Sequence, residues 1–206
     1  MSNSLNVLVS QVRQCRVCRD TPKAGKPSLP HEPRPVLQVS TAARIIIAGQ
    51  APGTRVHASG KPFTDPSGDR LRSWMGITEK VFYDPDKLAI VPMGFCFPGL
   101  DAKGGDLPPR AECAPLWREA LMQAMPQLTL VLAIGMYAQN WHMGNQRKST
   151  LTETVRNWRQ YHEMTPLSVI PMPHPSWRNT GWLKKNPWFE AELLPVLKAD
   201  VKALVS

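Results

Sequence analysis

Four cysteines and one histidine-bearing loop are the residues of this chain whose types and spacing most directly suggest chemistry. Cys15 and Cys18 are separated by two residues near the start, and Cys96 and Cys113 follow much later. In a reducing compartment, four such cysteines indicate a metal or cluster site rather than two disulfides. The loop Pro173–Ser176 is the second candidate, because it contains a histidine and comes directly after a run of apolar residues.

Four short apolar runs, typical of strands buried on both faces, must position these residues. The runs cover residues 44–48, 88–93, 128–134 and 167–172. Helices are predicted for residues 67–75, 110–125, 136–143 and 150–158, and for the chain after Asn186–Pro187, with a kink at Pro195. The alternation predicts an α/β fold with three layers, α/β/α, around a central four-stranded, mainly parallel sheet.

Three loops that follow predicted strands carry unusual residues. They are Gly49–Gly53, Gly94–Cys96 and Pro173–Ser176. In an open α/β sheet, ligands bind at the carboxyl ends of the strands. We therefore expect the three loops to converge on one site at that end of the sheet.

The composition is that of a folded protein, and its net charge favours an anionic partner. Hydrophobic residues make up 42% of the chain and charged residues 20%, which excludes wholesale disorder. Lys and Arg number 25 against 16 Asp and Glu, and the net charge of +9 favours phosphate-rich partners. The 206 residues suit one domain, so we expect a single domain over residues 1–206. Residues 1–40 would form a cysteine-bearing, proline-rich segment packed on it.

The chain has no sequence feature of a membrane or exported protein. No apolar run approaches the roughly 20 residues of a membrane-spanning helix, and the first residues lack the layout of a signal peptide. We therefore expect a cytoplasmic protein with no membrane partner, and we expect it to be a monomer.

Two motifs resemble those of the uracil-DNA glycosylase superfamily, most closely its iron-sulfur (4Fe-4S) bacterial and archaeal branch. That branch has Gly-Glu-Ala-Pro-Gly followed by Gly-x-Pro-Phe, and here Gly49–Gly53 is followed by Gly60–Phe63 at the same distance. Its late motif is His-Pro-Ser/Ala, matched by His174-Pro175-Ser176. The resemblance covers nearly the whole chain. It implies a DNA-repair hydrolase that cleaves the N-glycosidic bond of uracil or a related deaminated base and leaves an abasic site.

The resemblance also implies a role for the cysteines. The family places its cluster ligands where this chain has Cys15, Cys18, Cys96 and Cys113, so we expect a [4Fe-4S] cluster with a structural role. Zinc accepts the same four thiolates, and reduced cysteines without a ligand are a third alternative. The residues themselves do not choose among these.

The resemblance implies further site residues. His174 would hydrogen-bond the departing base and Phe63 would stack on it. The base edge or adjacent phosphates would be contacted by Gln50, Ala51, Pro52, Gly53 and Ser176. DNA would be bound by Arg55, Lys61, Trp177, Arg178 and Lys184, since aromatic side chains replace lost stacking and basic ones neutralise phosphates.

Two departures from the branch affect the chemistry. Gln50 replaces its catalytic glutamate, and a glutamine cannot act as a general base. We therefore expect Asp65, in a segment similar to that of a second branch, to be the base or to hold the water, with Gln50 beside it. Pro92 replaces an asparagine that recognises uracil, so the preferred base stays open. The segment Lys-Arg-Arg-Ile-His, through which some relatives bond to DNA covalently, is absent from the sequence.

These departures support an alternative: a catalytically weak or inactive DNA- or nucleotide-binding member of the same superfamily. A less favoured alternative is an enzyme that acts on free nucleosides. The role of His57 and the preference for single or double strands stay open.

Overall fold

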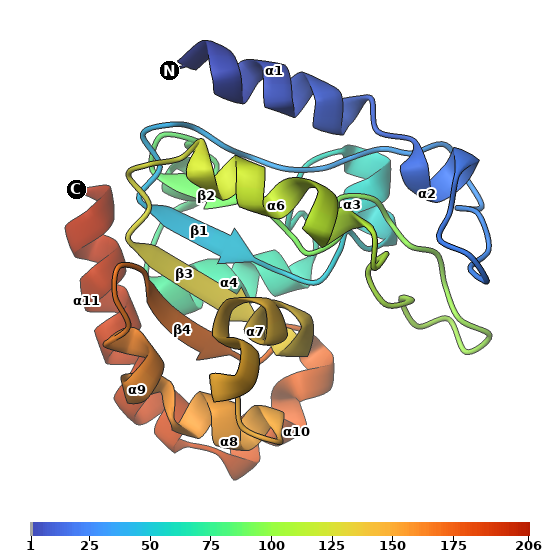
Figure 1. The fold of residues 1–206 in the computed structure, drawn as a ribbon. Coiled ribbons are helices and arrows are strands. Elements are labelled where there is room, and N and C mark those ends of the chain that lie inside the picture. Colours follow the sequence, from blue (N-terminus) through green and yellow to red (C-terminus); the bar gives the residue numbers. More distant parts are fainter. Residues whose placement is uncertain (1) are drawn as a thin grey trace.

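The computed structural model describes residues 2–206 and contains one sheet of four parallel strands (Figure 1). The strands are β1 (Ile45–Ala48), β2 (Leu88–Ile90), β3 (Leu130–Ile134) and β4 (Ser168–Met172), in the order β2-β1-β3-β4. Each neighbouring pair is parallel. The predicted central four-stranded sheet is therefore confirmed, and each strand is one to three residues shorter than its predicted run.

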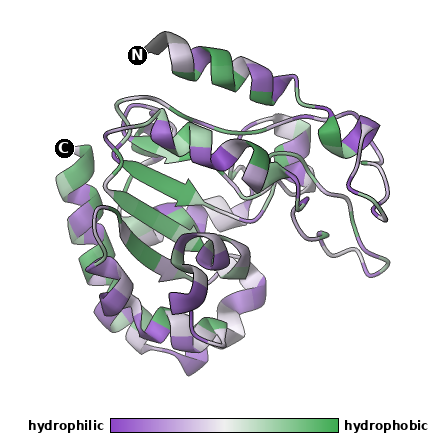
Figure 2. Cartoon of the chain, in the orientation of Figure 1, coloured by the Kyte–Doolittle hydropathy of each residue, from purple (hydrophilic) through white to green (hydrophobic). Residues whose placement is uncertain are grey.

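The sheet is covered on both faces, because successive side chains of a strand point to opposite sides. Ile45 and Ile47 of β1 pack in one buried cluster with side chains of α4 and α11. Ile46 and Ala48 pack in the other with side chains of α1, α6 and α7. Figure 2 shows the strands as the most uniformly apolar elements of the chain. The predicted three-layer α/β/α architecture is confirmed.

The helices connect the strands in the predicted order. They are α1 (Ser2–Arg13), α2 (Val17–Asp20), α3 (Thr54–Ser59), α4 (Pro66–Met75), α5 (Glu79–Phe82), α6 (Cys113–Gln123), α7 (Gly135–Met143), α8 (Leu151–Arg156), α9 (Trp158–His162), α10 (Thr180–Lys185) and α11 (Leu194–Val205). Short 3-10 turns cover Gly144–Gln146 and Trp177–Asn179. None of the helices in residues 2–206 is long and apolar enough to cross a membrane.

Two predicted helices are interrupted for local reasons. Thr150 and Glu153 form a reciprocal capping box at the start of α8, but the helix ends at Arg156, where the Asn157 side chain donates to the Glu153 carbonyl. The C-terminal helix has a wider π-helical turn at Phe189–Leu193, directly before Pro195. Proline cannot donate the i→i−4 hydrogen bond, so the predicted kink takes the form of this turn.

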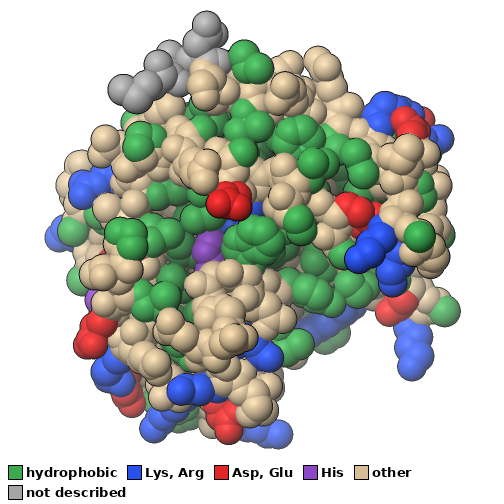
Figure 3. Space-filling model, viewed as in Figure 1, with side chains coloured by type: hydrophobic (Ala, Val, Ile, Leu, Met, Phe, Trp, Pro, Cys, Tyr) green, Lys and Arg blue, Asp and Glu red, His purple; other side chains and the backbone are tan. Residues whose placement is uncertain are grey.

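The N-terminal segment packs on the sheet layers. Leu5 and Val12 of α1 are buried, and α1 lies against α6 (Figure 1). The proline-rich chain then runs along the outer edge of β2, where Gln38 and Ile90 exchange two backbone hydrogen bonds of 2.9 and 2.7 Å. On the face seen in Figure 3, apolar side chains occupy the middle and most Lys and Arg side chains lie around the margin.

Candidate active site

A pocket opens at the carboxyl ends of the strands, where the sequence predicts one. The cavity is about 80 Å³. Its walls include Gln50, Ala51, Pro52, Gly53, Phe63, Asp65, Pro92, Asp106 and His174. The loops after β1, β2 and β4 therefore meet, and they bring together all the predicted catalytic residues.

Hydrogen bonds between loops hold this pocket together beyond the ends of the strands. The amides of Met93 and Gly94 donate to the carbonyls of Gly49 and Gln50, each over 2.9 Å. A side chain at Gly94 would crowd Pro109, since a Cβ there would lie 3.1 Å from that ring. The first motif, Gly49–Gly53, is thus fixed against the loop after β2.

His174 has a defined tautomer. Its Nδ1 accepts a hydrogen bond of 3.2 Å from the Ser176 amide, and its carbonyl accepts one of 2.7 Å from the Asn179 side chain. Burial lowers the pKa of His174 below its ordinary value, although the carboxylates of Asp65 and Asp106 act in the opposite direction. The imidazole is therefore neutral at pH 7, and its proton is on Nε2. This leaves one N–H donor for a group bound in the pocket.

Asp65 has two functions in this geometry. It is the N-cap of α4, and its Oδ1 accepts hydrogen bonds from the Ser67 amide, at 2.8 Å, and from the Ser67 hydroxyl. The residue also lines the pocket. The cap orients the carboxylate, which lies close enough to His174 to act on the pKa of the imidazole.

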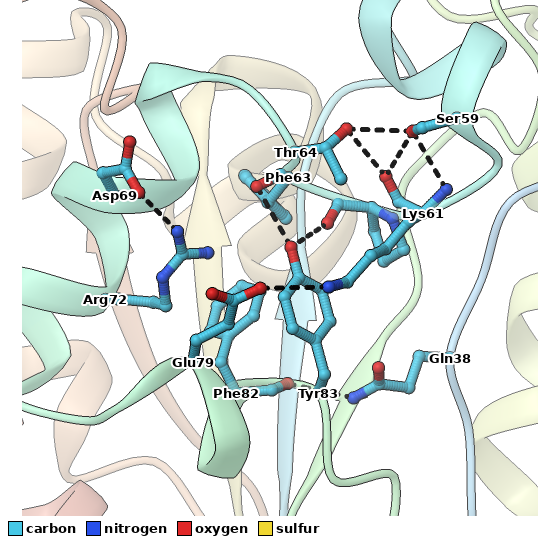
Figure 4. Close-up of polar contacts among 11 residues, drawn as sticks. Gln38, Ser59, Lys61, Phe63, Thr64, Asp69, Arg72, Glu79, Phe82 and Tyr83 are labelled. Carbon is cyan, nitrogen blue, oxygen red and sulfur yellow. Dashed lines mark hydrogen bonds and ion pairs between the residues drawn. The ribbon is translucent and has the colours of Figure 1, made fainter.

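Phe63 is held in an unusual backbone conformation. Its φ of 54° is left-handed, which a bulky residue rarely adopts. The Tyr83 hydroxyl donates to the carbonyls of Pro62, at 2.8 Å, and Phe63, at 3.2 Å (Figure 4). Burial raises the pKa of Tyr83, so the hydroxyl stays protonated as a donor. The Phe63 ring meets Phe82 edge to face, with 5.8 Å between ring centroids.

Gly68 permits this conformation, and its replacement by alanine is expected to destabilise the fold. A Cβ at Gly68 would lie 2.0 Å from the Phe63 carbonyl oxygen. Relieving this overlap costs about 3 kcal/mol, which outweighs the roughly 1 kcal/mol that alanine gains in a helix. We expect Gly68→Ala to lower the Tm by about 4–8 °C in thermal unfolding.

Gly181 provides the matched control. It lies in α10, and a Cβ there would meet no atom within 4 Å. Gly181→Ala is therefore expected to leave the Tm unchanged or slightly raised. Equal Tm values for the two variants would contradict the role of Gly68.

A groove of about 510 Å³ continues from the pocket and shares Gln50, Asp65 and His174 with it. Its outer walls include Arg55, Ser176, Trp177 and Arg178. Trp177 is 76% exposed, the most exposed of the large apolar side chains. An exposed aromatic ring beside two guanidinium groups suits a strand of nucleic acid.

Two of the predicted DNA-binding residues lie outside this groove. The ammonium of Lys61 pairs with Glu79 at 3.0 Å and stands 3.6 Å above the Tyr83 ring (Figure 4). Lys184 is an exposed residue of α10 that does not line the groove. His57 is absent from the pocket walls too: its ring lies 4.2 Å from that of His31, and burial lowers its pKa.

The four cysteines line one cavity, although they come from three separate segments. The Phe95 amide donates to the Cys113 sulfur over 3.4 Å. Burial raises the pKa of Cys96 to about 12 and that of Cys113 still further, so free thiols here would be neutral. Within residues 2–206, no three His, Cys, Asp or Glu side chains are close enough together to hold a single metal ion.

A buried arginine of α6 contacts the backbone just after β2. Arg118 is fully buried and donates to the carbonyls of Val91 and Pro92 and, over 2.8 Å, to Nε2 of His142. Burial lowers the pKa of His142 to about 3, so this imidazole is a neutral acceptor. No carboxylate among residues 2–206 pairs with Arg118, whose nearest anionic group is the Cys113 thiolate when ionised.

Sequence reasoning missed Asp106 and Arg118. Asp106 follows Asp101 in a glycine-containing loop, and no motif distinguishes the two aspartates. Arg118 is the only basic residue of α6, and nothing in the sequence around it marks it as buried. Both roles depend on contacts with distant parts of the chain.

The chain was also compared with known protein families. Residues 37–198 match the family model described as the uracil DNA glycosylase superfamily. The match includes every residue of the pocket and groove except Val36, together with Cys96 and Cys113, whereas Cys15 and Cys18 precede it. The chain therefore belongs to the uracil DNA glycosylase superfamily.

Proposed function

We propose that this protein is a DNA-repair glycosylase that hydrolyses the N-glycosidic bond of uracil or a related deaminated base and leaves an abasic site. The observation that carries the proposal is the neutral His174, with its Nε2–H in a pocket that opens into a groove bearing Trp177 and two arginines. Cytoplasmic location, a monomeric state and DNA as the partner are parts of the same proposal.

The chemistry follows from what each group can do. A target base that leaves the duplex would enter the pocket and stack on Phe63. His174 would donate its Nε2–H to a carbonyl oxygen of the base, where negative charge develops as the bond to the sugar breaks. The Asp65 carboxylate would stabilise the oxocarbenium-like sugar or hold the attacking water. Arg55 and Arg178 would bind the flanking phosphates.

The residues that face the base edge support a substrate range wider than uracil. Pro92 has no N–H, and its carbonyl already accepts a hydrogen bond of 3.1 Å from Arg118. The Gln50 amide lies in the pocket wall, and its Nε2 makes only a long contact of 3.4 Å with the Leu107 carbonyl. Because an amide can both donate and accept, Gln50 suits uracil, hypoxanthine and xanthine alike.

We further propose that the four cysteines hold a [4Fe-4S] cluster, with zinc as the alternative. The donor set fits: four cysteines share a cavity, one sulfur accepts an amide hydrogen bond, and a buried arginine offsets the negative charge of four thiolates. Tetrahedral zinc would draw the sulfurs to within about 3.8 Å of one another. Both centres would use the same four thiolates, so metal analysis of the purified protein distinguishes them.

A weak or inactive DNA-binding protein is the second candidate. Its specific support is Gln50, which cannot act as a base, together with the N-cap bonds that occupy Oδ1 of Asp65. Such a protein would bind DNA with strong salt dependence and release no base.

An excision assay separates the two candidates. Labelled oligonucleotides with uracil, hypoxanthine or xanthine, single- and double-stranded, would be incubated with the protein and cleaved by alkali at abasic sites. We expect excision of at least one base by the wild-type protein. Intact strands with every substrate would overturn the glycosylase proposal in favour of the binding protein.

Arg178, which lines the groove, and Lys61, which does not, provide a matched test of whether DNA binds in the groove. Arg178→Ala is expected to weaken binding to a duplex and to reduce the slope of log K against log salt by about one, because one phosphate contact is lost. Lys61→Ala is expected to leave the slope unchanged, since Lys61 pairs with Glu79 outside the groove. A wild-type slope for Arg178→Ala would contradict this placement of DNA.

A further inference from the structure

We propose that Asp106, rather than Asp65, takes the proton from the attacking water, an inference that rests on the proposed glycosylase function. Asp106 belongs to neither motif that carries the family resemblance. Its assignment comes from its place in the fold, its lack of hydrogen-bond donors and the charges around it.

Asp106 stands where the pocket meets the groove. It lines both cavities, as Asp65 and His174 do. A Cβ at Gly53 would lie 3.3 Å from Asp106 Oδ2, so the carboxylate lies directly against the backbone of the first motif. A water molecule between this carboxylate and a base held by His174 would lie on the path to the sugar.

The loop around Asp106 is ordered by its own backbone. Leu100 and Asp106 form an antiparallel bridge, and the Leu107 amide donates to the Gly99 carbonyl over 3.0 Å. The Asp101 carboxylate accepts hydrogen bonds of 2.8 Å from the amides of Lys103 and Gly105. In Figure 1 this yellow-green loop, just before α6, projects beyond the carboxyl ends of the strands. Asp106 is therefore presented to the pocket by a closed hairpin.

The two carboxylates of the site differ in the hydrogen bonds that they accept. Asp65 uses Oδ1 as the N-cap of α4. No donor in residues 2–206 hydrogen-bonds the Asp106 carboxylate, and the titratable or charged groups that act on its pKa are Arg178, His174 and Asp65. Burial and the nearby Asp65 raise the pKa of Asp106, although Arg178 and His174 act in the opposite direction. A carboxylate with a raised pKa is the stronger base, and two carboxylates in different environments suit two different roles.

The proposed step balances as follows. The bond between sugar C1′ and the base nitrogen breaks, and its electron pair leaves with the base, whose carbonyl oxygen accepts a hydrogen bond from Nε2–H of His174 while the proton stays on His174. The water oxygen bonds to C1′, and its proton moves to Asp106. The Asp65 carboxylate stabilises the positive sugar. Asp106 then returns the proton through solvent to the released base, so the products are the abasic sugar and the neutral base.

Single-turnover excision by Asp106→Asn tests this role. We expect the rate at saturating protein to fall by about 10²–10⁴-fold, with DNA affinity and Tm unchanged. The wild-type rate should fall as acid protonates Asp106, and this acid limb should be absent from the pH profile of the variant. Formate should partly restore the rate of Asp106→Ala. A purely structural role would give neither the altered profile nor the rescue.

A substrate with a better leaving group distinguishes the role of His174, which stabilises the departing base, from that of Asp106, which takes the proton from water. 5-Fluorouracil departs more readily than uracil, so it should relieve a defect in His174→Ala but not the defect in Asp106→Asn. Asp101→Asn is the control within the same loop and should excise within about threefold of wild type, because its amide oxygen still accepts the two backbone hydrogen bonds. Normal excision by Asp106→Asn overturns this assignment alone, whereas no excision by wild type overturns the proposed function with it.

Discussion

Replacing His174 with alanine is expected to lower the single-turnover rate of base excision by about 10²–10³-fold, the usual cost of removing one donor from a developing oxyanion. The Ser176 amide occupies Nδ1, so Nε2–H is the donor that the alanine variant loses. Affinity for undamaged duplex should change little, because Arg55, Trp177 and Arg178 remain in the groove. Rapid-quench kinetics with saturating protein would measure the rate separately from binding.

The protonation state of His174 gives this prediction a second observable. Burial lowers the pKa of His174, so the imidazole stays neutral to a lower pH than an ordinary histidine does. The nitrogen NMR shift of Nε2 should be that of a protonated nitrogen in a neutral ring at pH 7. A doubly protonated His174 at pH 7, or a His174→Ala variant with the wild-type excision rate, would contradict its role as neutral donor.

Loss of the proposed metal centre is the second large effect that we expect. Cys113 is buried, and the cavity that it shares with Cys15, Cys18 and Cys96 joins the N-terminal segment to α6. Anaerobically purified wild-type protein should be brown and contain about four irons and four sulfides per chain. Cys113→Ser should lose the colour and the iron, and its Tm should fall by about 10 °C because a cross-link worth several kcal/mol is lost.

Metal analysis decides between the alternatives for this site. One zinc ion and no iron per chain would show that the four cysteines bind a structural zinc ion instead of the cluster. Chelation that removes the metal should expose residues 1–40 to protease before the rest of the chain, since the cavity joins this segment to the sheet layers. The proposal of a metal site would be contradicted if the wild-type protein contained neither iron nor zinc and Cys113→Ser had the wild-type Tm.

The sequence predicts the scaffold well because the strands are short, apolar and regularly separated by helices. Ile45–Ile47 has no polar residue to place on an outer face, so only a strand covered on both sides fits it. The capping box of Thr150 and Glu153 is equally local, and it forms at the predicted start of a helix. The carboxyl ends of parallel strands meet by geometry, and for this reason the pocket contains the loops that the sequence marks.

What the sequence does not predict depends on contacts between distant segments. Lys61 is only two residues from Phe63 in the pocket wall. Its side chain nevertheless contacts Glu79 and Tyr83, which are eighteen or more residues away in the chain. The left-handed Phe63 requires Gly68 and the Tyr83 hydroxyl together. Asp106 reaches the pocket only because its hairpin closes against Gly53.

Mass spectrometry of a duplex that contains one deaminated base tests the glycosylase proposal most directly. A glycosylase converts the substrate strand to one that has lost the base and gained a water, and an equal amount of free base appears in solution. We expect this conversion with the wild-type protein on at least one of uracil, hypoxanthine and xanthine, and its near absence with His174→Ala. A strand of unchanged mass, under conditions where the protein binds the duplex fully, would contradict the proposed activity.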